Sequence, residues 1–378
     1  MAGIYIHIPY CKQKCTYCDF YKVTGDLKEQ KVAFIQALTD EINQRKEYLN
    51  GEAIDTIYFG GGTPSVLSFN HFQTIFEEIY KHFKINENAE ITMEANPDDL
   101  TELYFNSLSP LPFNRLSIGI QSFNNYHLKL INRRHDASQA INAVVNARKY
   151  GFDNISIDLI YGLPTQTLDD WKYQLDEAFK LDVEHISAYN LTYEEGTALW
   201  TQRKKNIIKE VDEETTLEMF DFMRNEMILR GYDAYEISNY SKPGYRSRHN
   251  SAYWKFTPYL GLGPSAHSFD GKTRQWNISS INKYIDNIKN HKAYFEKEIL
   301  SEQNFYNDYI MVSLRTSEGI DIQNIKQKFG SEYFDYFCYQ ADKQIDKGLL
   351  EKNAAYFTLT KEGLHLSNQV IVELMKTD

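Results

Sequence analysis

Short apolar segments alternate with amphipathic ones through the first half of the chain. Six short runs are rich in β-branched and aromatic residues and end at Gly, Pro, Asn, Asp or Gln, which is typical of buried strands. They span residues 3–8, 54–59, 89–95, 115–120, 155–160 and 185–191. Between them apolar positions recur with helical spacing, as at 28–48 and 137–150. We therefore predict an α/β fold in which about six βα units form an incomplete parallel β/α barrel.

The pattern changes in the second half. Beyond residue 192 the alternation loosens, and a dense aromatic block covers 235–269. From about residue 301 short helical stretches precede a strand at 356–359 and a last helix, which indicates a small, mainly helical, winged-helix-like domain. We expect three parts: the barrel at 1–235, an extension at 236–300 and the C-terminal domain at 301–378.

Composition narrows the functional class. The 378 residues carry a formal net charge of −11, with 42% hydrophobic and 25% charged residues, as in ordinary globular proteins. An acidic balance without a basic stripe argues against a nucleic-acid partner. No apolar run is long enough to cross a bilayer and the first residues lack a signal pattern, so we expect a cytoplasmic protein.

Three of the four cysteines lie within eight residues, at Cys11, Cys15 and Cys18, and Cys338 stands alone. Disulfides would not be distributed in this way. Three thiolates on one loop can hold three irons of a cubane cluster and leave the fourth iron open to another ligand. The alternative is a zinc site completed by His7 or Cys338, since zinc favours four N or S ligands.

The spacing CxxxCxxC, with Tyr17 before the third cysteine, resembles the signature of the radical S-adenosylmethionine superfamily. The resemblance implies a [4Fe-4S] cluster held by Cys11, Cys15 and Cys18. It also implies that the amino and carboxylate groups of S-adenosylmethionine chelate the fourth iron, and that an electron from the cluster yields an adenosyl radical. The protein's part is then to bind and orient these cofactors.

Further polar residues stand at or near the carboxyl ends of the predicted strands. Such positions converge on one mouth of a β/α barrel, although each residue alone could be a solvated or internally bonded group. Glycines after the second strand let backbone N–H groups approach a ligand. The resemblance assigns S-adenosylmethionine contacts to Tyr5, Tyr17, Gly61, Gly62, Thr63, Glu94, Gln121, Arg133, Asp158 and Thr192.

The stretches YFGGGTPS, MEANP, IGIQSF and DLIYGLP resemble one group of the superfamily, which contains oxygen-independent coproporphyrinogen III oxidase and the haem chaperones. Two departures speak against the oxidase. Phe20 stands where the oxidase has a further cysteine, and only ten residues precede Cys11, where the oxidase has a long arm. Coproporphyrinogen III oxidase activity is therefore not expected, and whether the chain turns over any substrate stays open.

The block from His249 to Trp254 matches the HNxxYW pattern of the haem chaperones. A histidine can offer an axial nitrogen to haem iron, while aromatic rings lie against the macrocycle and Arg246 or Arg248 meets its propionates. Without the resemblance, a buried histidine that hydrogen-bonds the backbone would be the better interpretation. His267 is a weaker ligand candidate.

The resemblance thus implies a haem chaperone that binds haem, a [4Fe-4S] cluster and S-adenosylmethionine. Its expected partners are haem-receiving respiratory membrane proteins and an electron donor such as flavodoxin or ferredoxin, with membrane association during haem transfer. Two alternatives remain at this point: a radical oxidoreductase that acts on a porphyrinogen, and a zinc-stabilised scaffold without radical chemistry.

Overall fold

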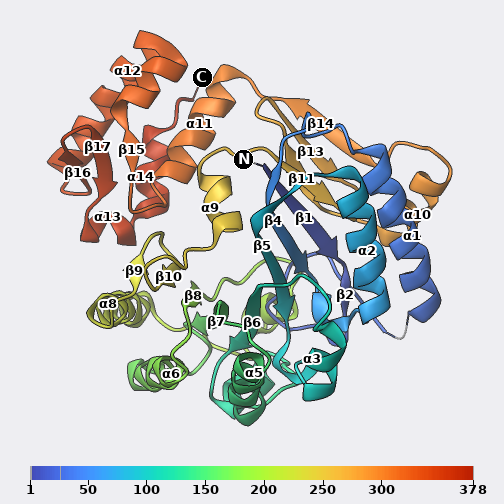
Figure 1. Cartoon of the computed structure of the whole chain (residues 1–378). Helices are drawn as coiled ribbons and strands as arrows, with labels where there is room; N and C mark the ends of the chain where they lie inside the picture. Colours follow the sequence, from blue (N-terminus) through green and yellow to red (C-terminus); the bar gives the residue numbers. More distant parts are fainter. Residues whose placement is uncertain (1, 26, 378) are drawn as a thin grey trace.

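A 12-stranded sheet forms the centre of the computed structural model, which describes residues 2–25 and 27–377 (Figure 1). Its strands run in the order β14-β13-β12-β11-β1-β4-β5-β6-β7-β8-β10-β9. Neighbours from β1 to β8 along this order pair in parallel. These six strands correspond to the six predicted ones: β1 (Ala2–Ile8), β4 (Ile54–Gly61), β5 (Ile85–Ala95), β6 (Arg115–Gln121), β7 (Ile155–Tyr161) and β8 (His185–Asn190).

Helices connect the parallel strands and stand around the outside of the curved sheet, as a β/α barrel requires (Figure 1). The principal ones are α1 (Lys28–Gln44), α2 (Phe69–His82), α3 (Glu102–Leu108), α5 (Ala137–Lys149), α6 (Leu168–Lys180) and α8 (Glu213–Leu229). Shorter pieces complete the connections: β2 (Tyr10–Cys11), β3 (Val23–Thr24), η1 (Pro64–Val66), η2 (Pro97–Asp99), α4 (Asn125–Leu130) and α7 (Ala198–Lys204).

Each parallel strand presents different side chains to its two faces, because successive residues of a strand point in opposite directions. In β1, Ile4, Ile6 and Ile8 are fully buried in the apolar core, whereas the alternating Tyr5 and His7 contact other polar side chains. The strands thus pack against the helices through an apolar layer and enclose polar residues on the other side. That polar interior holds the candidate site.

The extension after residue 232 widens the sheet on both sides. It comprises β9 (Asp233–Ala234), β10 (Asn239–Ser241), α9 (Arg248–Trp254), β11 (Tyr259–Leu262), β12 (His267–Phe269), β13 (Thr273–Asn277), α10 (Ile281–Lys289) and β14 (Phe295–Ile299). β11 pairs with β1 as a further parallel strand. At Gly261 an added Cβ would lie 1.9 Å from the carbonyl oxygen of His267, so only glycine fits the β11–β12 pairing.

The C-terminal part has its own hydrophobic core, with buried side chains from Tyr306 to Leu374. It contains α11 (Glu302–Ser313), β15 (Ile320–Asp321), α12 (Ile322–Asp346), β16 (Leu350–Asn353), β17 (Tyr356–Leu359), α13 (Lys361–His365) and α14 (Ser367–Leu374). The fold is a parallel α/β sheet with a mostly helical C-terminal domain, as predicted. In the described part of the chain no helix combines the length and the apolar character that a membrane span needs.

Candidate functional site

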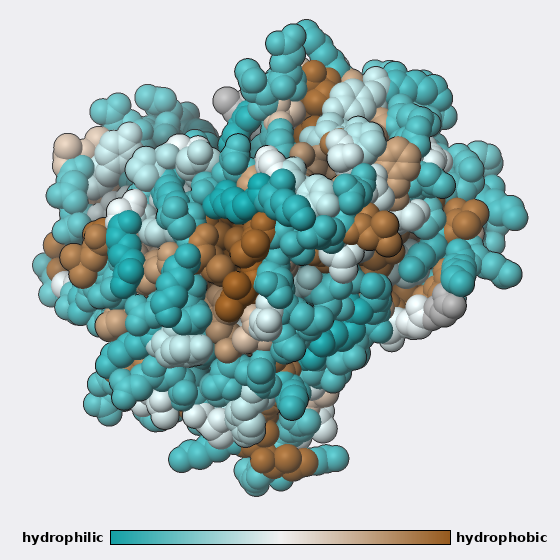
Figure 2. All heavy atoms as spheres, turned by 60° about the horizontal axis from the view of Figure 1, so that its bottom comes forward, coloured by the Kyte–Doolittle hydropathy of each residue, from teal (hydrophilic) through white to brown (hydrophobic). Residues whose placement is uncertain are grey.

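A cavity of about 510 Å³ opens at the carboxyl ends of the parallel strands. Figure 2 turns the lower end of Figure 1, where these strands end, towards the viewer and shows a mostly hydrophilic face with separate hydrophobic areas. Twelve of the fourteen predicted site residues line the cavity, namely Cys11, Cys15, Tyr17, Cys18, Gly61, Gly62, Thr63, Glu94, Gln121, Arg133, Asp158 and Thr192. Tyr5 and His249 are not among them. The structure therefore brings together side chains that are up to 181 positions apart in the sequence, from Cys11 to Thr192.

The cysteine loop begins directly after β1 and is held at its base by the parallel pairing of β2 and β3. Two of its thiols receive hydrogen bonds from other elements. The Thr63 hydroxyl donates to Cys11 Sγ at 3.2 Å, and a guanidinium N–H of Arg133 donates to Cys15 Sγ at 3.5 Å. Burial raises the pKa of the Cys11 thiol, and the Thr63 hydrogen bond opposes this shift. Donors to sulfur stabilise the thiolate, which is the form that ligates a metal.

The surroundings of the thiols favour a cluster over zinc. His7 has both ring nitrogens in contact with other groups, Nε2 with the Tyr21 carbonyl oxygen at 2.9 Å and Nδ1 with the Tyr5 hydroxyl at 3.2 Å. Cys338 lies on α12 and belongs to the C-terminal core. Three thiols without a fourth protein ligand fit a cubane cluster with one open iron.

The glycine loop after β4 packs directly on the cysteine loop. The Gly62 N–H donates to the Ile8 carbonyl oxygen at 2.8 Å, and a Cβ at Gly62 would lie 2.7 Å from the carbonyl oxygens of Ile8 and Tyr10. Gly61 has φ 102°, in the left-handed region. Side chains are thus excluded from the two positions, and the backbone itself forms this wall of the cavity.

Two carboxylates, Glu94 on β5 and Asp158 on β7, line the cavity without an ion-pair partner among the described residues. Tyr58 donates to Glu94 Oε1 at 2.9 Å, and Ser117 donates to Asp158 Oδ1 at 3.4 Å. Burial, together with the Asp158 charge, raises the pKa of Glu94 to about 7, and burial raises the pKa of Asp158 to about 6. A cationic ligand would relieve this cost, because an opposite charge nearby favours the ionised carboxylate.

Arg133 brings a positive charge to the same cavity. One guanidinium nitrogen donates to Asn96 Oδ1 at 2.6 Å and to the Gly119 carbonyl oxygen at 2.5 Å, while its buried Nε has no partner. No carboxylate within ion-pair distance neutralises it in the described chain. Gln121, beside it at the end of β6, has φ 68°, a strained value for a residue with a side chain. Unpaired groups of both signs in one cavity fit a zwitterion such as the methionine moiety of S-adenosylmethionine.

His249 lies instead at the opposite end of the strands, beneath Tyr5 and Tyr58. It is 2% exposed, and its ring stacks on Tyr58 with centroids 5.0 Å apart. Nδ1 contacts the Thr56 hydroxyl at 2.8 Å and Nε2 the Tyr253 hydroxyl at 2.9 Å. Burial, followed by the Arg115 charge, lowers the pKa of His249 to about 3, so the ring is neutral. In this arrangement neither nitrogen is free for a metal, and the partners of His249 are side-chain hydroxyls rather than the backbone group of the alternative interpretation.

Other predicted positions near this block also have partners. Arg246 forms ion pairs with Asp233 and Glu318, and the Arg248 guanidinium donates to the Asn88 carbonyl oxygen at 2.5 Å. The His267 ring lies beside Trp276, with centroids 6.4 Å apart. None of the three lines the cavity.

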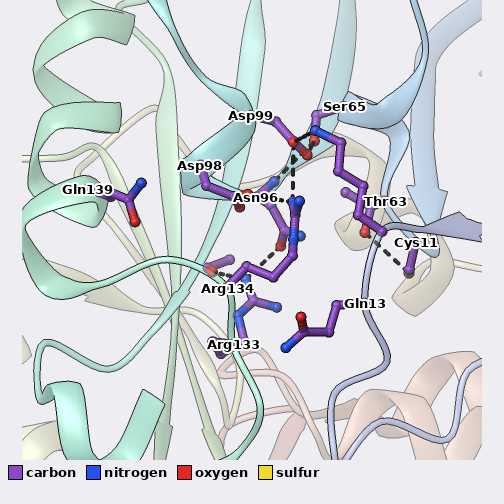
Figure 3. A network of polar contacts seen from close by, with 12 residues as sticks. Cys11, Gln13, Thr63, Ser65, Asn96, Asp98, Asp99, Arg133, Arg134 and Gln139 are labelled. Carbon is purple, nitrogen blue, oxygen red and sulfur yellow. Dashed lines mark hydrogen bonds and ion pairs between the residues drawn. The ribbon is translucent and has the colours of Figure 1, made fainter. Parts of the chain in front are cut away.

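Sequence reasoning missed a polar network behind the cavity wall, shown in Figure 3. Asp99, at the end of η2, contacts Ser65, Arg134 and Lys12, and the Ser65 hydroxyl accepts from the Asn96 N–H at 3.2 Å. The only signal for it was the sequence Asn96-Pro97-Asp98-Asp99 directly after the third strand.

Comparison with known proteins identifies the family of this chain. The profile of the "Radical SAM superfamily" matches residues 5–178, and that of the "HemN C-terminal domain" matches residues 300–366. A protein of Lactococcus lactis named "Heme chaperone HemW" is 32% identical over 99% of this chain and 97% of its own length. The chain belongs to the HemW family. A second HemW, from Bacillus subtilis, is 33% identical over 98% of both chains.

A solved structure has the same fold as this chain. Coproporphyrinogen III oxidase (HemN) of Escherichia coli, described as a radical SAM enzyme, superposes with a TM-score of 0.86 over 99% of this chain and 90% of that one, at 24% identity. This likeness confirms the fold. Membership of the radical SAM superfamily implies a [4Fe-4S] cluster and S-adenosylmethionine as cofactors of this chain.

Proposed function

We propose that this protein is a haem chaperone that delivers haem to respiratory membrane proteins and carries a [4Fe-4S] cluster with S-adenosylmethionine. The observation that supports it most is the match to proteins named heme chaperone HemW along nearly the full length of both chains. The cytosol is its proposed location, with membrane association during transfer and a flavodoxin or ferredoxin as electron donor.

We assign a role to each cavity residue from its position. Cys11, Cys15 and Cys18 hold three irons, and Thr63 and Arg133 donate to two of these sulfurs. The backbone of Gly61 and Gly62 offers a surface without side chains to the methionine moiety. When bound, the reduced cluster supplies the electron that cleaves a C–S bond of S-adenosylmethionine.

The charged residues orient the sulfonium cofactor. Glu94 and Asp158 meet its positive charges, Arg133 with Gln121 meets its negative one, and Tyr17 and Thr192 line the remaining wall. Tyr5 acts from below: its ring stacks on Tyr58, which donates to Glu94. Tyr5 therefore supports a carboxylate rather than lining the cavity.

Haem binds outside this cavity in our proposal, with His249 as axial ligand. Because both ring nitrogens of His249 are hydrogen-bonded, coordination requires that Tyr253 or Thr56 release the ring and that α9 shift away from the strands. Haem binding in this proposal therefore requires a conformational change of α9.

A haem titration tests the proposal. Haem is added to cluster-loaded and cluster-free protein, wild type and His249→Ala, and Soret absorption is followed; an apo-haem membrane acceptor is then supplied. We expect saturable binding that weakens in His249→Ala, followed by transfer to the acceptor. Equal binding by both proteins would remove His249 from the site, and absence of saturable binding would overturn the chaperone.

The oxidase alternative has its own assay. Reconstituted protein is incubated anaerobically with reductant, S-adenosylmethionine and coproporphyrinogen III. We expect no protoporphyrinogen IX, and its formation would replace the chaperone by an oxidoreductase.

A further inference from the structure

Three loops that contact the proposed cofactors meet behind the cavity at one side chain, Asp99 (Figure 3). The first is the cysteine loop, through Lys12; the second is the glycine loop, through Ser65; the third precedes α5, through Arg134. None of these contacts is local, since Lys12 and Asp99 are 87 positions apart in the sequence.

The two oxygens of the Asp99 carboxylate bind different partners. Oδ2 accepts from the Ser65 hydroxyl at 2.8 Å, and Oδ1 accepts from Lys12 Nζ and from an Arg134 N–H at 3.2 Å. The Asp99 side chain is 2% exposed, whereas that of Lys12 is 53% exposed. A buried carboxylate with charge-assisted hydrogen bonds holds its partners more firmly than a surface ion pair does.

Each partner is next to a residue of the cavity wall. Lys12 follows Cys11, Ser65 is two residues after Thr63, and Arg134 follows Arg133. Thr63 and Arg133 are the two donors to the cysteine sulfurs. A shift of any one loop therefore moves a group that contacts a thiol.

We propose that Asp99 is a positioning residue that fixes the cysteine loop, the glycine loop and the Arg133 loop relative to one another, so that the cluster and S-adenosylmethionine meet in one geometry. Asp99 does not line the cavity, so it acts through the three loops. The inference rests on the cluster and S-adenosylmethionine alone, so a failed haem titration leaves it intact.

The neighbouring Asp98 provides a matched control. It also lies in η2 and pairs with Arg134 at 2.6 Å, yet among the described residues no hydrogen bond or ion pair joins it to the cysteine loop or the glycine loop. Comparing Asp99→Ala with Asp98→Ala thus separates loss of an ion pair to Arg134 alone from loss of the contacts to the cysteine loop and the glycine loop.

The experiment uses the full chain reconstituted anaerobically with iron and sulfide. Three quantities are measured for each variant: the rate of iron release to a chelator, the S-adenosylmethionine concentration that half-converts the electron paramagnetic resonance signal of the reduced cluster, and the thermal midpoint of the cluster-free protein. For Asp99→Ala we expect about tenfold weaker S-adenosylmethionine binding and faster iron release, from the loss of charge-assisted hydrogen bonds. Asp98→Ala should stay within about twofold of wild type, the scale of a partly exposed ion pair.

Asp99→Asn should fall between the two, because its amide oxygen still accepts one hydrogen bond. The proposal is overturned if Asp99→Ala folds and matches Asp98→Ala in cluster signal and cofactor affinity. Should Asp99→Ala not fold, Lys12→Met and Ser65→Ala each remove one arm of the network. If both of these variants, alone and combined, retain wild-type iron release and affinity, the proposal is equally overturned.

Discussion

The two ends of the barrel both contain buried polar residues, but those residues differ in how they are satisfied. At the mouth, Glu94 and Asp158 accept hydrogen bonds but have no ion-pair partner among the described residues, and the Nε of Arg133 has no partner there. At the floor, His249 has a hydrogen-bond partner at each ring nitrogen. Unpaired atoms also occur at the floor, where the buried Nε of Arg115 has no partner. The mouth differs in holding two buried carboxylates whose pKa values are raised, a costly arrangement that a cationic ligand would relieve.

Two more buried residues at the floor, Glu90 and His185, also have their polar atoms hydrogen-bonded. Both oxygens of Glu90 accept hydrogen bonds from the start of α9, from the N–H groups of Arg248 and His249, each at 3.0 Å. His185 contacts the Ser156 hydroxyl at 2.7 Å and the Tyr235 hydroxyl at 2.8 Å. Floor residues thus join α9 and the extension to the strands, and their loss should affect stability before it affects the cofactors.

The largest effect should come from the mouth. Cys15→Ser removes one of three thiolate ligands, and we expect cluster content to fall to background while the fold is kept, since Cys15 is a half-buried loop residue. Iron and sulfide analysis with visible absorption measures the first, and circular dichroism the second. Stoichiometric zinc without labile sulfide in wild-type protein, or a collapsed spectrum of the variant, would contradict this account.

At the floor we expect the reverse: a substitution should lower stability and leave cofactor binding unchanged. Glu90→Ala leaves two N–H groups of α9 without an acceptor and should lower the free energy of unfolding by about 2–3 kcal/mol, the typical cost for hydrogen bonds to a charged group. Denaturant unfolding of the cluster-free protein measures it. S-adenosylmethionine affinity of the reconstituted variant should stay close to wild type; a large loss of affinity at unchanged stability would mean that the two ends are not distinct.

The pKa values of the mouth carboxylates yield a prediction on pH. Protonated Glu94 cannot attract a cation, and its pKa is raised to about 7. Binding of S-adenosylmethionine should therefore tighten by about tenfold from pH 6 to pH 8, as the ionised fraction of one carboxylate rises. Titrations of the reduced cluster at several pH values measure it, and Glu94→Gln should flatten the dependence.

Folding stability should change in the opposite direction with pH. Because the folded pKa of Glu94 lies above its unfolded value, this group stabilises the cluster-free protein fully below about pH 4.3, and that contribution is lost as pH rises through about 7. A cluster-free protein whose stability is the same at pH 5 and pH 7.5, in both wild type and Glu94→Gln, would show that the carboxylate is not buried in solution.

The sequence predicted the mouth far better than the floor. Strand periodicity and Gly, Pro and Asn at the strand ends placed Cys11, Gly62, Glu94 and Asp158 at one edge, because parallel strands of a barrel share their direction. The pairing of β11 with β1 was not foreseen, since the Gly-rich segment at 259–268 lacks a strand's alternation. Asp99 was missed for another reason: its partners come from three separate loops, and no local pattern records contacts of that range.

The sequence also does not decide whether His249 is a haem ligand or a structural residue. The prediction with the smallest expected effect tests this. Tyr253→Phe removes the hydroxyl that contacts His249 Nε2 at 2.9 Å and leaves the ring buried among the same aromatic neighbours. The lost hydrogen bond should cost about 1 kcal/mol of stability. If His249 is the axial ligand, the variant also spares haem the work of breaking that bond, so haem affinity should increase about fivefold.

A haem titration of Tyr253→Phe, with Tyr253→Phe/His249→Ala as its control, decides the point. Tighter binding that disappears in the double variant would mean that the floor opens to admit haem and that its hydrogen bonds set the threshold. Unchanged affinity, with the expected small loss of stability, would leave His249 as a structural residue that supports Tyr58 and Glu94, and haem would have to bind through other groups.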